Sequence, residues 1–449
     1  MILRMPAVPF PRLDGGDVDP WRWHLAITAV FAALVCWRLG IPSKIYFDEV
    51  HYVPAARKML AHLPANAEHP LLGKSAIAAA IALWGDSPVV WRIPSAVMGV
   101  VGLFAFGRML WWAGHIGGHA RGRVASVAGM VLLATDFAWF IQSRIAMLDM
   151  VMAGFAMMAL WLVAAACALP AGTPVWQRSV RLALGGVCLG LAMGAKWSVL
   201  PVVALVGLFA VAARGLTGGR AAMARADLAP FPGVSLVEIL FYLGSVPLIA
   251  YVATFFPAFG WSQNAPSLIG LPQWHTYMLE LQASVIKHHP YQSVWYQWVG
   301  NWRAIWYLYE NVDGAQRGVV LIGNPFSMLV GLGALAWCGW ATVRPGGRQR
   351  WDTGLVVALY AACLMLWIVG AKPVQFYYHY LLPGTFLMAA LALAVEDLWQ
   401  AGPRWRREAL GIVVIAVGIF VWFWPIIAAM PLHKGAMSYE DWMWLKSWQ

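Results

Sequence analysis

The sequence predicts an all-α integral membrane protein with about eleven transmembrane helices. Of its 449 residues, 61% are hydrophobic and only 11% are charged, against about 25% charged in an average soluble domain. The mean hydropathy of +0.65 agrees, because so few charged side chains cannot cover the surface of a soluble globule of this size. These numbers exclude a disordered chain, a coiled coil and a disulfide-stabilised scaffold. They favour a single polytopic membrane domain over residues 1–449, with no separate soluble domain.

The excess of positive charge has a simple explanation in such a protein. Lys and Arg total 31 and Asp and Glu total 20, which gives a formal net charge of +11. Basic residues collect in the cytoplasmic loops of membrane proteins, and no stretch here combines dense Lys and Arg with polar sequence, so we expect no nucleic-acid binding. The five cysteines lie in or beside apolar segments without a pairing motif and are expected to pack as small residues.

Eleven apolar segments are predicted to span the membrane, since a hydrocarbon core of about 30 Å needs about 20 apolar residues per helix. They are residues 24–41, 88–112, 124–141, 150–170, 181–195, 197–213, 234–256, 319–343, 353–371, 380–398 and 410–430. The segment 71–84 is shorter and contains Lys74, so we expect an interfacial helix parallel to the membrane. The first residues show no cleavable signal pattern, and the first span is expected to be retained.

The loops between these spans predict the orientation of the chain. With the N-terminus in the cytoplasm, every short inner loop is rich in arginine, as the positive-inside rule requires. The inner-loop arginines are Arg121, Arg123, Arg178, Arg181, Arg214, Arg220, Arg225, Arg344, Arg348, Arg350, Arg404, Arg406 and Arg407. The outer segments 42–87 and 257–318 are longer and more mixed in charge. We expect a multi-pass membrane protein whose outer face carries the chemistry.

The ionisable residues near apolar sequence converge on that outer face. Such residues are costly in a membrane and usually have a partner or a function. They are Asp48, Glu49, His51, His69, Lys74, Arg144, Asp149, Lys196, His288, His289, Lys372 and His379. The segment 257–318 adds many tryptophans and tyrosines, which form either an interfacial aromatic belt or a platform on which sugar or lipid stacks.

Two adjacent carboxylates, Asp48 and Glu49, open the first outer loop, 42–87, which we expect to be the catalytic loop. On a helix, neighbouring residues point in different directions, so one of the pair can act as a base while the other holds a cation or the acceptor. The alternative is an ordinary helix N-terminus, where acidic side chains favour the macrodipole.

Two cationic residues on the same face are candidates for binding an anionic group. Arg144 lies in DFAWFIQSRIAMLDM, five residues before Asp149, and its planar fork matches phosphate oxygens. Lys196 lies in a tight turn after Gly190 and Gly194, which allow close helix packing. Alternatively, Arg144 and Lys196 anchor the chain among lipid phosphates.

Asp149, Lys74 and several histidines supply further candidate contacts to a substrate. His69 and Lys74 bracket the predicted interfacial helix, and HHPYQSVWYQW and QFYYHYLLP contribute His288, His289, Pro290 and His379. A divalent cation could bind among the histidines and acids, but no spacing matches a dedicated metal site and the metal ligands stay unassigned. No firm cofactor is predicted.

The signatures of soluble nucleotide and hydrolase enzymes are absent from the sequence. A secondary transporter would show broken helices and ionisable residues near mid-span, whereas here the ionisable residues gather at one end of the spans. This favours an enzyme acting at the outer membrane surface on a lipid-borne substrate.

Seven motifs together resemble the bacterial branch of the protein O-mannosyltransferases, the polyprenyl (dolichyl)-phosphate-mannose–protein mannosyltransferase family of the GT-C class. They are FDEVHY, HPLLGK, WRIPSAVMG, SRIAMLD, GAKWS, HHPYQSVWYQW followed by RAIWYLYE, and YYHYLLP, in family order from about residue 47 to 383. Leu71 replaces the second proline of the family's usual HPPLGK. The large soluble insert of the eukaryotic members is missing, which leaves acceptor selection open.

The resemblance implies a GT-C-type glycosyltransferase with about eleven transmembrane helices and periplasmic loops carrying interfacial helices. It implies inverting transfer of mannose from a polyprenyl-phosphate-mannose donor to Ser or Thr hydroxyls of a secreted or translocating protein, with the export machinery as a candidate partner. The family's acidic pair maps onto Asp48 and Glu49, with the aspartate catalytic, and its donor-binding cations map onto Arg144 and Lys196.

Two other functions stay open at this point. A related transferase could pass a polyprenyl-phosphate-linked sugar to a lipid or glycan, as an aminoarabinose transferase does with lipid A. A transporter of polyprenyl-linked sugars is the second, although the clustering of ionisable groups at one end of the spans argues against it.

Overall fold

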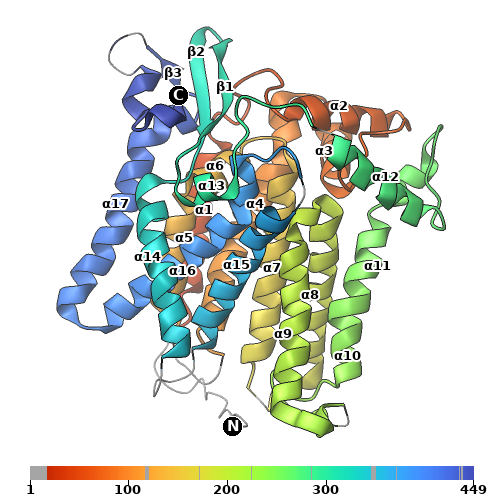
Figure 1. The fold of residues 1–449 in the computed structure, drawn as a ribbon, viewed down its shortest axis with the longest axis vertical. Coiled ribbons are helices and arrows are strands. Elements are labelled where there is room, and N and C mark those ends of the chain that lie inside the picture. Colours follow the sequence, from red (N-terminus) through yellow and green to blue (C-terminus); the bar gives the residue numbers. More distant parts are fainter. Residues whose placement is uncertain are drawn as a thin grey trace.

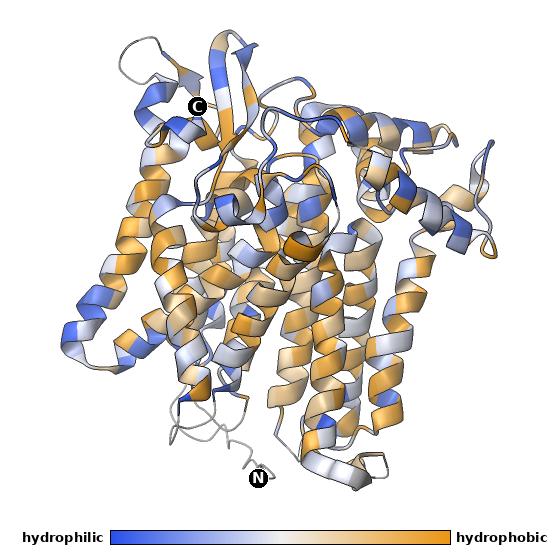
Figure 2. Cartoon of the chain, viewed as in Figure 1, coloured by the Kyte–Doolittle hydropathy of each residue, from blue (hydrophilic) through white to orange (hydrophobic). Residues whose placement is uncertain are grey.

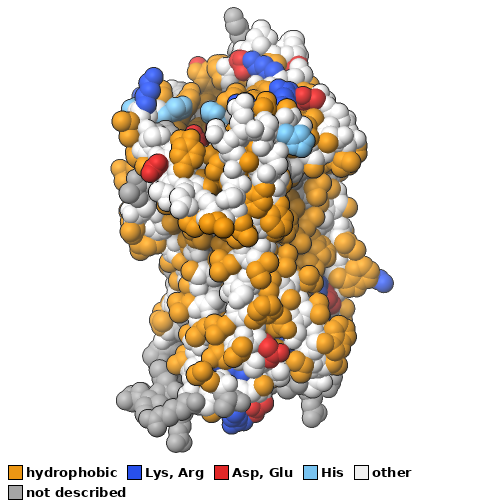
Figure 3. Space-filling view, turned by 90° about the vertical axis from the view of Figure 1, so that its right-hand side faces the viewer, with side chains coloured by type: hydrophobic (Ala, Val, Ile, Leu, Met, Phe, Trp, Pro, Cys, Tyr) orange, Lys and Arg blue, Asp and Glu red, His pale blue; other side chains and the backbone are white. Residues whose placement is uncertain are grey.

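The computed structural model of the chain describes residues 18–116, 121–170, 172–223, 225–284, 286–344, 350–370, 372–433, 435 and 438–449. Long helices run side by side as one bundle, and short helices and strands gather at one end of it (Figure 1). We call this the loop-bearing end and the opposite one the arginine-rich end. The hydropathy of the long helices is high along their middle and falls toward both ends (Figure 2), and the side surface shows a broad apolar belt (Figure 3).

Nine helical segments among the described residues are long and apolar enough to cross a membrane. They are α4 (Pro88–Ala113), α7 (Leu148–Ala168), α8 (Val175–Ala195), η1–α9 (Trp197–Gly218), α10–η3–α11–η4 (Leu236–Gly260, in which η3 is a π-helical turn between α10 and α11), α14 (Pro325–Val343), α15 (Trp351–Val369), η5–α16 (Tyr377–Gln400) and α17 (Pro403–Ile427). Each corresponds to a predicted span, so the multi-pass architecture is confirmed.

The two remaining predicted spans are shorter helices, and a count of eleven is therefore not confirmed. Helix α1 (Trp21–Cys36) has 16 residues and α5 (Arg123–Ala134) has 12. The predicted span 124–141 is interrupted because Asp136 caps a new helix, α6 (Phe137–Gln142), by accepting a hydrogen bond from the N–H of Trp139 at 2.9 Å.

The predicted interfacial helix is present as α3 (Leu72–Trp84). It packs beside α2 (Glu49–Leu60) and against α4 and α8, with the side chains of Lys74, Ile77 and Ile81 buried. Its orientation relative to a bilayer stays a prediction.

The described residues are mostly helical, as predicted, but a small three-stranded antiparallel sheet at the loop-bearing end was not predicted. Its strands are β1 (Ile305–Val312), β2 (Ala315–Leu321) and β3 (Pro431–Leu432), in that order. Asp313 and Gly314 form the β1–β2 turn with φ of +50° and +73°, the geometry of a tight hairpin turn. The predicted span 319–343 therefore begins in β2, and its helix starts only at Pro325.

The β1–β2 hairpin is bound to the first outer loop. Asp313, at the hairpin tip, accepts a hydrogen bond from the N–H of Ser43 at 2.9 Å. Glu310 of β1 forms an ion pair with Lys44. Two segments more than 250 residues apart thereby build one outer layer.

Close packing of α8 against the α10–α11 segment depends on glycine. A Cβ on Gly186 would lie 2.0 Å from the carbonyl oxygen of Tyr242, and one on Gly190 would lie 2.3 Å from that of Pro247. Since no other residue fits at these distances, the predicted role of the glycines before Lys196 is confirmed for Gly190. This packing fixes the C-terminal end of α8, which directly precedes Lys196.

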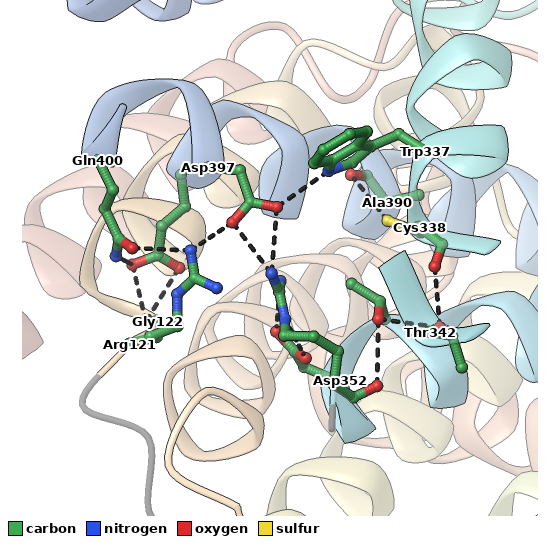
Figure 4. A network of polar contacts seen from close by, with 12 residues as sticks. Arg121, Gly122, Trp337, Cys338, Thr342, Asp352, Ala390, Asp397 and Gln400 are labelled. Carbon is green, nitrogen blue, oxygen red and sulfur yellow. Dashed lines mark hydrogen bonds and ion pairs between the residues drawn. The ribbon is translucent and has the colours of Figure 1, made fainter. Parts of the chain in front are cut away.

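At the arginine-rich end, Asp397 of α16 connects several helices (Figure 4). It accepts hydrogen bonds from Arg121 before α5, from Trp337 Nε1 of α14 at 2.9 Å and from Arg350 Nη1 at 3.1 Å. Arg350 also pairs with Asp352 of α15 at 2.9 Å. Arginines expected only to orient the chain thus also tie the ends of α5, α14, α15 and α16 together.

Candidate active site

Asp48 lies where the first outer loop turns into α2, of which it is the N-cap residue. The preceding residue, Phe47, has a φ of +49°, a left-handed conformation that costs a bulky residue about 1–3 kcal/mol and persists only where its surroundings enforce it. The Phe47 ring stacks on Tyr307 at a centroid distance of 3.8 Å and meets Tyr378 edge-on at 6.1 Å. Rings from two distant segments therefore hold the backbone that carries Asp48.

The carboxylate of Asp48 has the properties of a general base. It makes no capping hydrogen bond to α2, and desolvation raises its pKa to about 6 in spite of the positive charges of Lys196, His51 and Lys372. A base is most effective when its pKa lies near the working pH. The role of Asp48 as the catalytic base stays a prediction.

Glu49, in contrast, is engaged in a fully buried ion pair. Arg92 Nε lies 2.7 Å from Oε1 of Glu49 and Arg92 Nη2 lies 3.0 Å from Oε2, and both side chains are 0% exposed. Glu49 also accepts hydrogen bonds from the N–H groups of Tyr46 and Ala146, while Arg92 donates to three backbone carbonyls within residues 39–44. With both oxygens shielded and bonded, Glu49 holds the first outer loop on α4, and these contacts give no support to its predicted catalytic role.

Arg144 occupies the end of α1 instead of an open anion site. Its Nη1 donates to the carbonyl oxygens of Val35 at 2.6 Å and Trp37 at 2.8 Å, and its guanidinium lies 5.3 Å from the ring centroid of Phe140. A cation on the last carbonyls of a helix satisfies groups that have no helical partner and complements the dipole. These contacts give no support to the predicted phosphate-binding role of Arg144.

Lys196 does face the site, as an ion-pair partner of Asp149. Its Nζ lies 2.8 Å from each carboxylate oxygen of Asp149, and both side chains are buried. Lys372, between α15 and η5, is close enough that the charge of Lys196, after desolvation, contributes to lowering its pKa to about 8. Lys196 and Lys372 offer two cationic groups to an anionic ligand, and the carboxylates of Asp149 and Asp48 balance their charge when both are ionised. Lys372 belongs to the outer ionisable set in the sequence, but no motif singled it out.

His69 borders this cluster, whereas Lys74 lies beneath it. Desolvation and the charges of Lys196 and Lys372 hold the pKa of His69 well below its usual range, so its imidazole is neutral. Lys74 Nζ donates to the backbone carbonyls of His69 (2.7 Å) and Asn66 and is 0% exposed. Lys74 therefore closes the loop that carries His69 and is not placed to contact a substrate.

His379 lines the lower wall of the site. A narrow pocket there is bounded by Asp149, Ser198, Trp367, Tyr378 and His379, among others. His379 Nδ1 accepts a hydrogen bond from the N–H of Phe376 at 3.0 Å and its ring stacks on Trp367 at 3.9 Å. Its Nε2 is buried without a partner among the described residues, which suits a contact with a bound molecule.

The HHP segment lies outside this cluster. His288, His289 and Pro290 are exposed, and the His289 ring packs against the edge of Phe376 at 5.1 Å. The structure places them at the rim of the site, so their predicted contacts with substrate stay a prediction.

Three tyrosines lie near the two aspartates. Tyr307 is one of the aromatic residues of segment 257–318, for which a belt or a sugar platform is predicted, whereas Tyr52 and Tyr378 were not predicted as site residues. Asp48 and Asp149 lie within electrostatic reach of the hydroxyls of Tyr52, Tyr307 and Tyr378. Tyr52 stands four residues after Asp48 on α2, a spacing that puts both on one helix face and could have identified it. Tyr307 lies on a strand that was not predicted.

The described residues contain no group of three or more His, Cys, Asp or Glu side chains arranged to hold a metal ion. A divalent cation stays an open expectation.

Two models of known protein families match successive parts of the chain. Residues 25–261 match the sequence model of the dolichyl-phosphate-mannose-protein mannosyltransferases, and residues 270–448 match the C-terminal four-helix transmembrane region of protein O-mannosyltransferases. The protein is a membrane-embedded glycosyltransferase with a GT-C fold. More narrowly, the chain belongs to the dolichyl-phosphate-mannose–protein mannosyltransferase family, because the first match alone covers more than half of it.

The relatives and solved structures agree with this assignment. The chain is 26% identical to a polyprenol-phosphate-mannose–protein mannosyltransferase of Mycolicibacterium smegmatis, over 99% of this chain and 96% of the relative, and 26% identical to one of Mycobacterium tuberculosis, over 99% and 95%. Its fold is similar to that of the S. cerevisiae protein O-mannosyltransferase Pmt1-Pmt2 complex bound to the sugar donor, with a TM-score of 0.83 at 14% identity, covering 98% of this chain and 95% of that one. ArnT from Cupriavidus metallidurans bound to undecaprenyl phosphate gives a TM-score of 0.57 at 15% identity, over 93% and 67%.

Proposed function

We propose that this protein transfers mannose from a polyprenyl-phosphate carrier to Ser or Thr hydroxyls of proteins that cross the cytoplasmic membrane. The observation that carries the proposal is the juxtaposition of Asp48, a desolvated carboxylate without a capping hydrogen bond, with the lysine cluster of Lys196 and Lys372. The names of the relatives support the mannose donor and the protein acceptor.

The chemistry follows from these groups. Asp48 takes the proton of the acceptor hydroxyl while its oxygen attacks C1 of the sugar, and the bond between C1 and the phosphate oxygen breaks on the opposite side, which inverts the anomeric centre. The negative charge that grows on the departing phosphate is stabilised by Lys196 and Lys372, fixed in advance in a site of low dielectric. The phosphate is a good leaving group, so no general acid is needed.

Other predicted residues take supporting roles in this scheme. Glu49 with Arg92, and Arg144 on the end of α1, position the catalytic loop. His69 and His379, both facing the lysine cluster, contact the substrates. His288–Pro290 at the rim lie where an acceptor chain approaches, and the export machinery is a candidate partner there.

The orientation supports an active site on the outer face. The loop-bearing end carries Asp48, while Arg121, Arg178, Arg214 and Arg350 lie at the opposite end of the bundle. By the positive-inside rule that arginine-rich end, with the N-terminus, faces the cytoplasm, and the site faces the periplasm.

One experiment tests the function directly. The purified protein in nanodiscs is expected to move radiolabel from polyprenyl-phosphate-[¹⁴C]mannose to a peptide containing Ser and Thr. A matched peptide with Ala at those positions is expected to stay unlabelled. Label recovered in lipid A or a glycan, with none in the peptide, would contradict the protein acceptor, and label carried across a vesicle membrane without a new glycosidic bond would indicate a transporter.

The pH dependence of kcat/KM is expected to be bell-shaped with a maximum near neutral pH. Asp48 acts only when ionised, so activity rises through its pKa of about 6. Lys372 stabilises the phosphate only when protonated, so activity falls through its pKa of about 8. The measurement is the initial rate at low donor concentration from pH 5 to 10.

The matched variant for this profile is Lys372→Arg, because a guanidinium stays charged throughout. It is expected to keep the acid limb and lose the alkaline limb. An alkaline limb that persists unchanged in Lys372→Arg would remove Lys372 from the phosphate site.

A further inference from the structure

Tyr307 sits at an irregularity in β1. Trp306 pairs with Val320 and Leu308 with Val319, so Tyr307 is the extra residue of a β-bulge and has no partner across the ladder. Bulges re-aim a side chain, and they are frequent next to active sites. The RAIWYLYE motif that contains Tyr307 has no role in the chemistry described so far.

The ring of Tyr307 is tightly packed, and its hydroxyl is left without a hydrogen-bond partner among the described residues. One ring face lies on Phe47 at 3.8 Å and 19°, and the residue is 4% exposed. The hydroxyl itself is buried. Since buried polar groups are nearly always paired, an unpaired hydroxyl on the ring that supports Phe47, the residue before Asp48, points to a partner that arrives with the substrate.

The position of the hydroxyl favours the donor sugar as this partner. Burial raises the pKa of Tyr307 well above its usual range, and the charge of Asp149 adds more to this effect than that of Asp48. Tyr307 thus shares the electrostatic surroundings of Asp149, whose own partner Lys196 is assigned to the phosphate. In the proposed function the sugar carries this phosphate and is attacked by the hydroxyl that Asp48 deprotonates, so it must bind near both Lys196 and Asp48.

We propose that the Tyr307 hydroxyl donates a hydrogen bond to a hydroxyl of the sugar being transferred and thereby contributes to sugar selection. The proposal rests on the proposed function, and it names Tyr307 as a sugar-binding residue supplied by the second large outer loop. The ring on Phe47 couples this contact to the backbone that carries Asp48.

The test is Tyr307→Phe, which removes one oxygen and keeps the ring stack. We expect kcat/KM for the mannosyl donor to fall about three- to tenfold, the range for one lost hydrogen bond, with KM for the acceptor peptide unchanged. We expect the melting temperature to stay the same or rise, because the variant buries no unpaired hydroxyl. Tyr309→Phe is the matched control on the same strand, at a residue that is 50% exposed, and is expected to behave as wild type.

Monodeoxymannosyl donors identify the partner. For the donor that lacks the hydroxyl bound by Tyr307, wild type and Tyr307→Phe are expected to react at the same rate, whereas the other deoxy donors keep the difference. An unchanged kcat/KM for the full mannosyl donor would overturn the proposal, and so would a change confined to the peptide KM, which would move the contact to the acceptor. If wild type transfers no mannose to peptide at all, it is the proposed function that fails.

Discussion

Asp48→Asn is expected to lower kcat for mannosyl transfer by about 10²- to 10⁴-fold, the usual contribution of a general base. Asparagine has the same shape but cannot accept the proton of the acceptor hydroxyl. Although Asp48→Asn lowers activity, it is not expected to lower the stability of the protein at neutral pH. Because the folded state raises the pKa of Asp48 from 3.8 to about 6, the stability this group contributes is present below pH 4 and is lost as the pH rises through 6.

At pH 7, therefore, Asp48→Asn removes an unfavourable buried charge, and its melting temperature is expected to match or exceed that of wild type. The measurements are kcat at saturating donor and peptide, and thermal unfolding in the same detergent. Asp86→Asn is the control, because Asp86 is an exposed carboxylate at the same end, paired with Arg57 at 2.7 Å, and should stay within twofold of wild type. More than a tenth of wild-type kcat in Asp48→Asn would rule Asp48 out as the base.

Arg92→Met is expected to lower the free energy of unfolding by about 3–5 kcal/mol, as breaking a buried ion pair does elsewhere. The substitution leaves the Glu49 carboxylate buried and uncompensated, and it removes the donors that hold residues 39–44. The measurement is the melting temperature together with the yield of monodisperse protein. Arg57→Met breaks an exposed pair at the same end and is expected to cost less than about 1 kcal/mol.

The double variant Glu49→Gln/Arg92→Met shows whether the charge or the packing matters. It is expected to be more stable than Arg92→Met, because no unpaired charge is buried. Its remaining folded fraction is expected to keep measurable transfer activity, unlike Asp48→Asn. A wild-type melting temperature for Arg92→Met would contradict the structural role of the Glu49–Arg92 pair. A Glu49→Gln variant as inactive as Asp48→Asn would return Glu49 to catalysis.

The helical bundle and half of the site could be predicted because their signals are local. Apolar runs of about 20 residues identify spans by composition alone, and the alternation of arginine-rich loops predicts which polar residues share a face. Asp48, His69, Asp149, Lys196 and His379 were found in this way, and the structure brings them together.

What the sequence analysis missed depends on partners that are far apart in the chain. Whether Arg144 binds a phosphate or the end of α1 is decided by the packing of α1, more than 100 residues away. Arg92 stands in a motif that carried the resemblance, yet its partner Glu49 is on another helix. The β1–β2 hairpin did have a local signal, since Asp313-Gly314 between β-forming runs is typical of a tight turn, but the apolar run after it was read as the start of a span.

The hydrogen bond between Ser43 and Asp313 joins the first outer loop to a hairpin that is synthesised much later. Asp48 enters the membrane with the first helices, but the hairpin that grips its loop, and the Tyr307 ring that supports Phe47, are made only when some 270 further residues have been translated. The newly inserted N-terminal half holds Asp48 without the contacts that orient its backbone. Under the proposed function, competence for transfer therefore arises only after β1 and β2 have been translated.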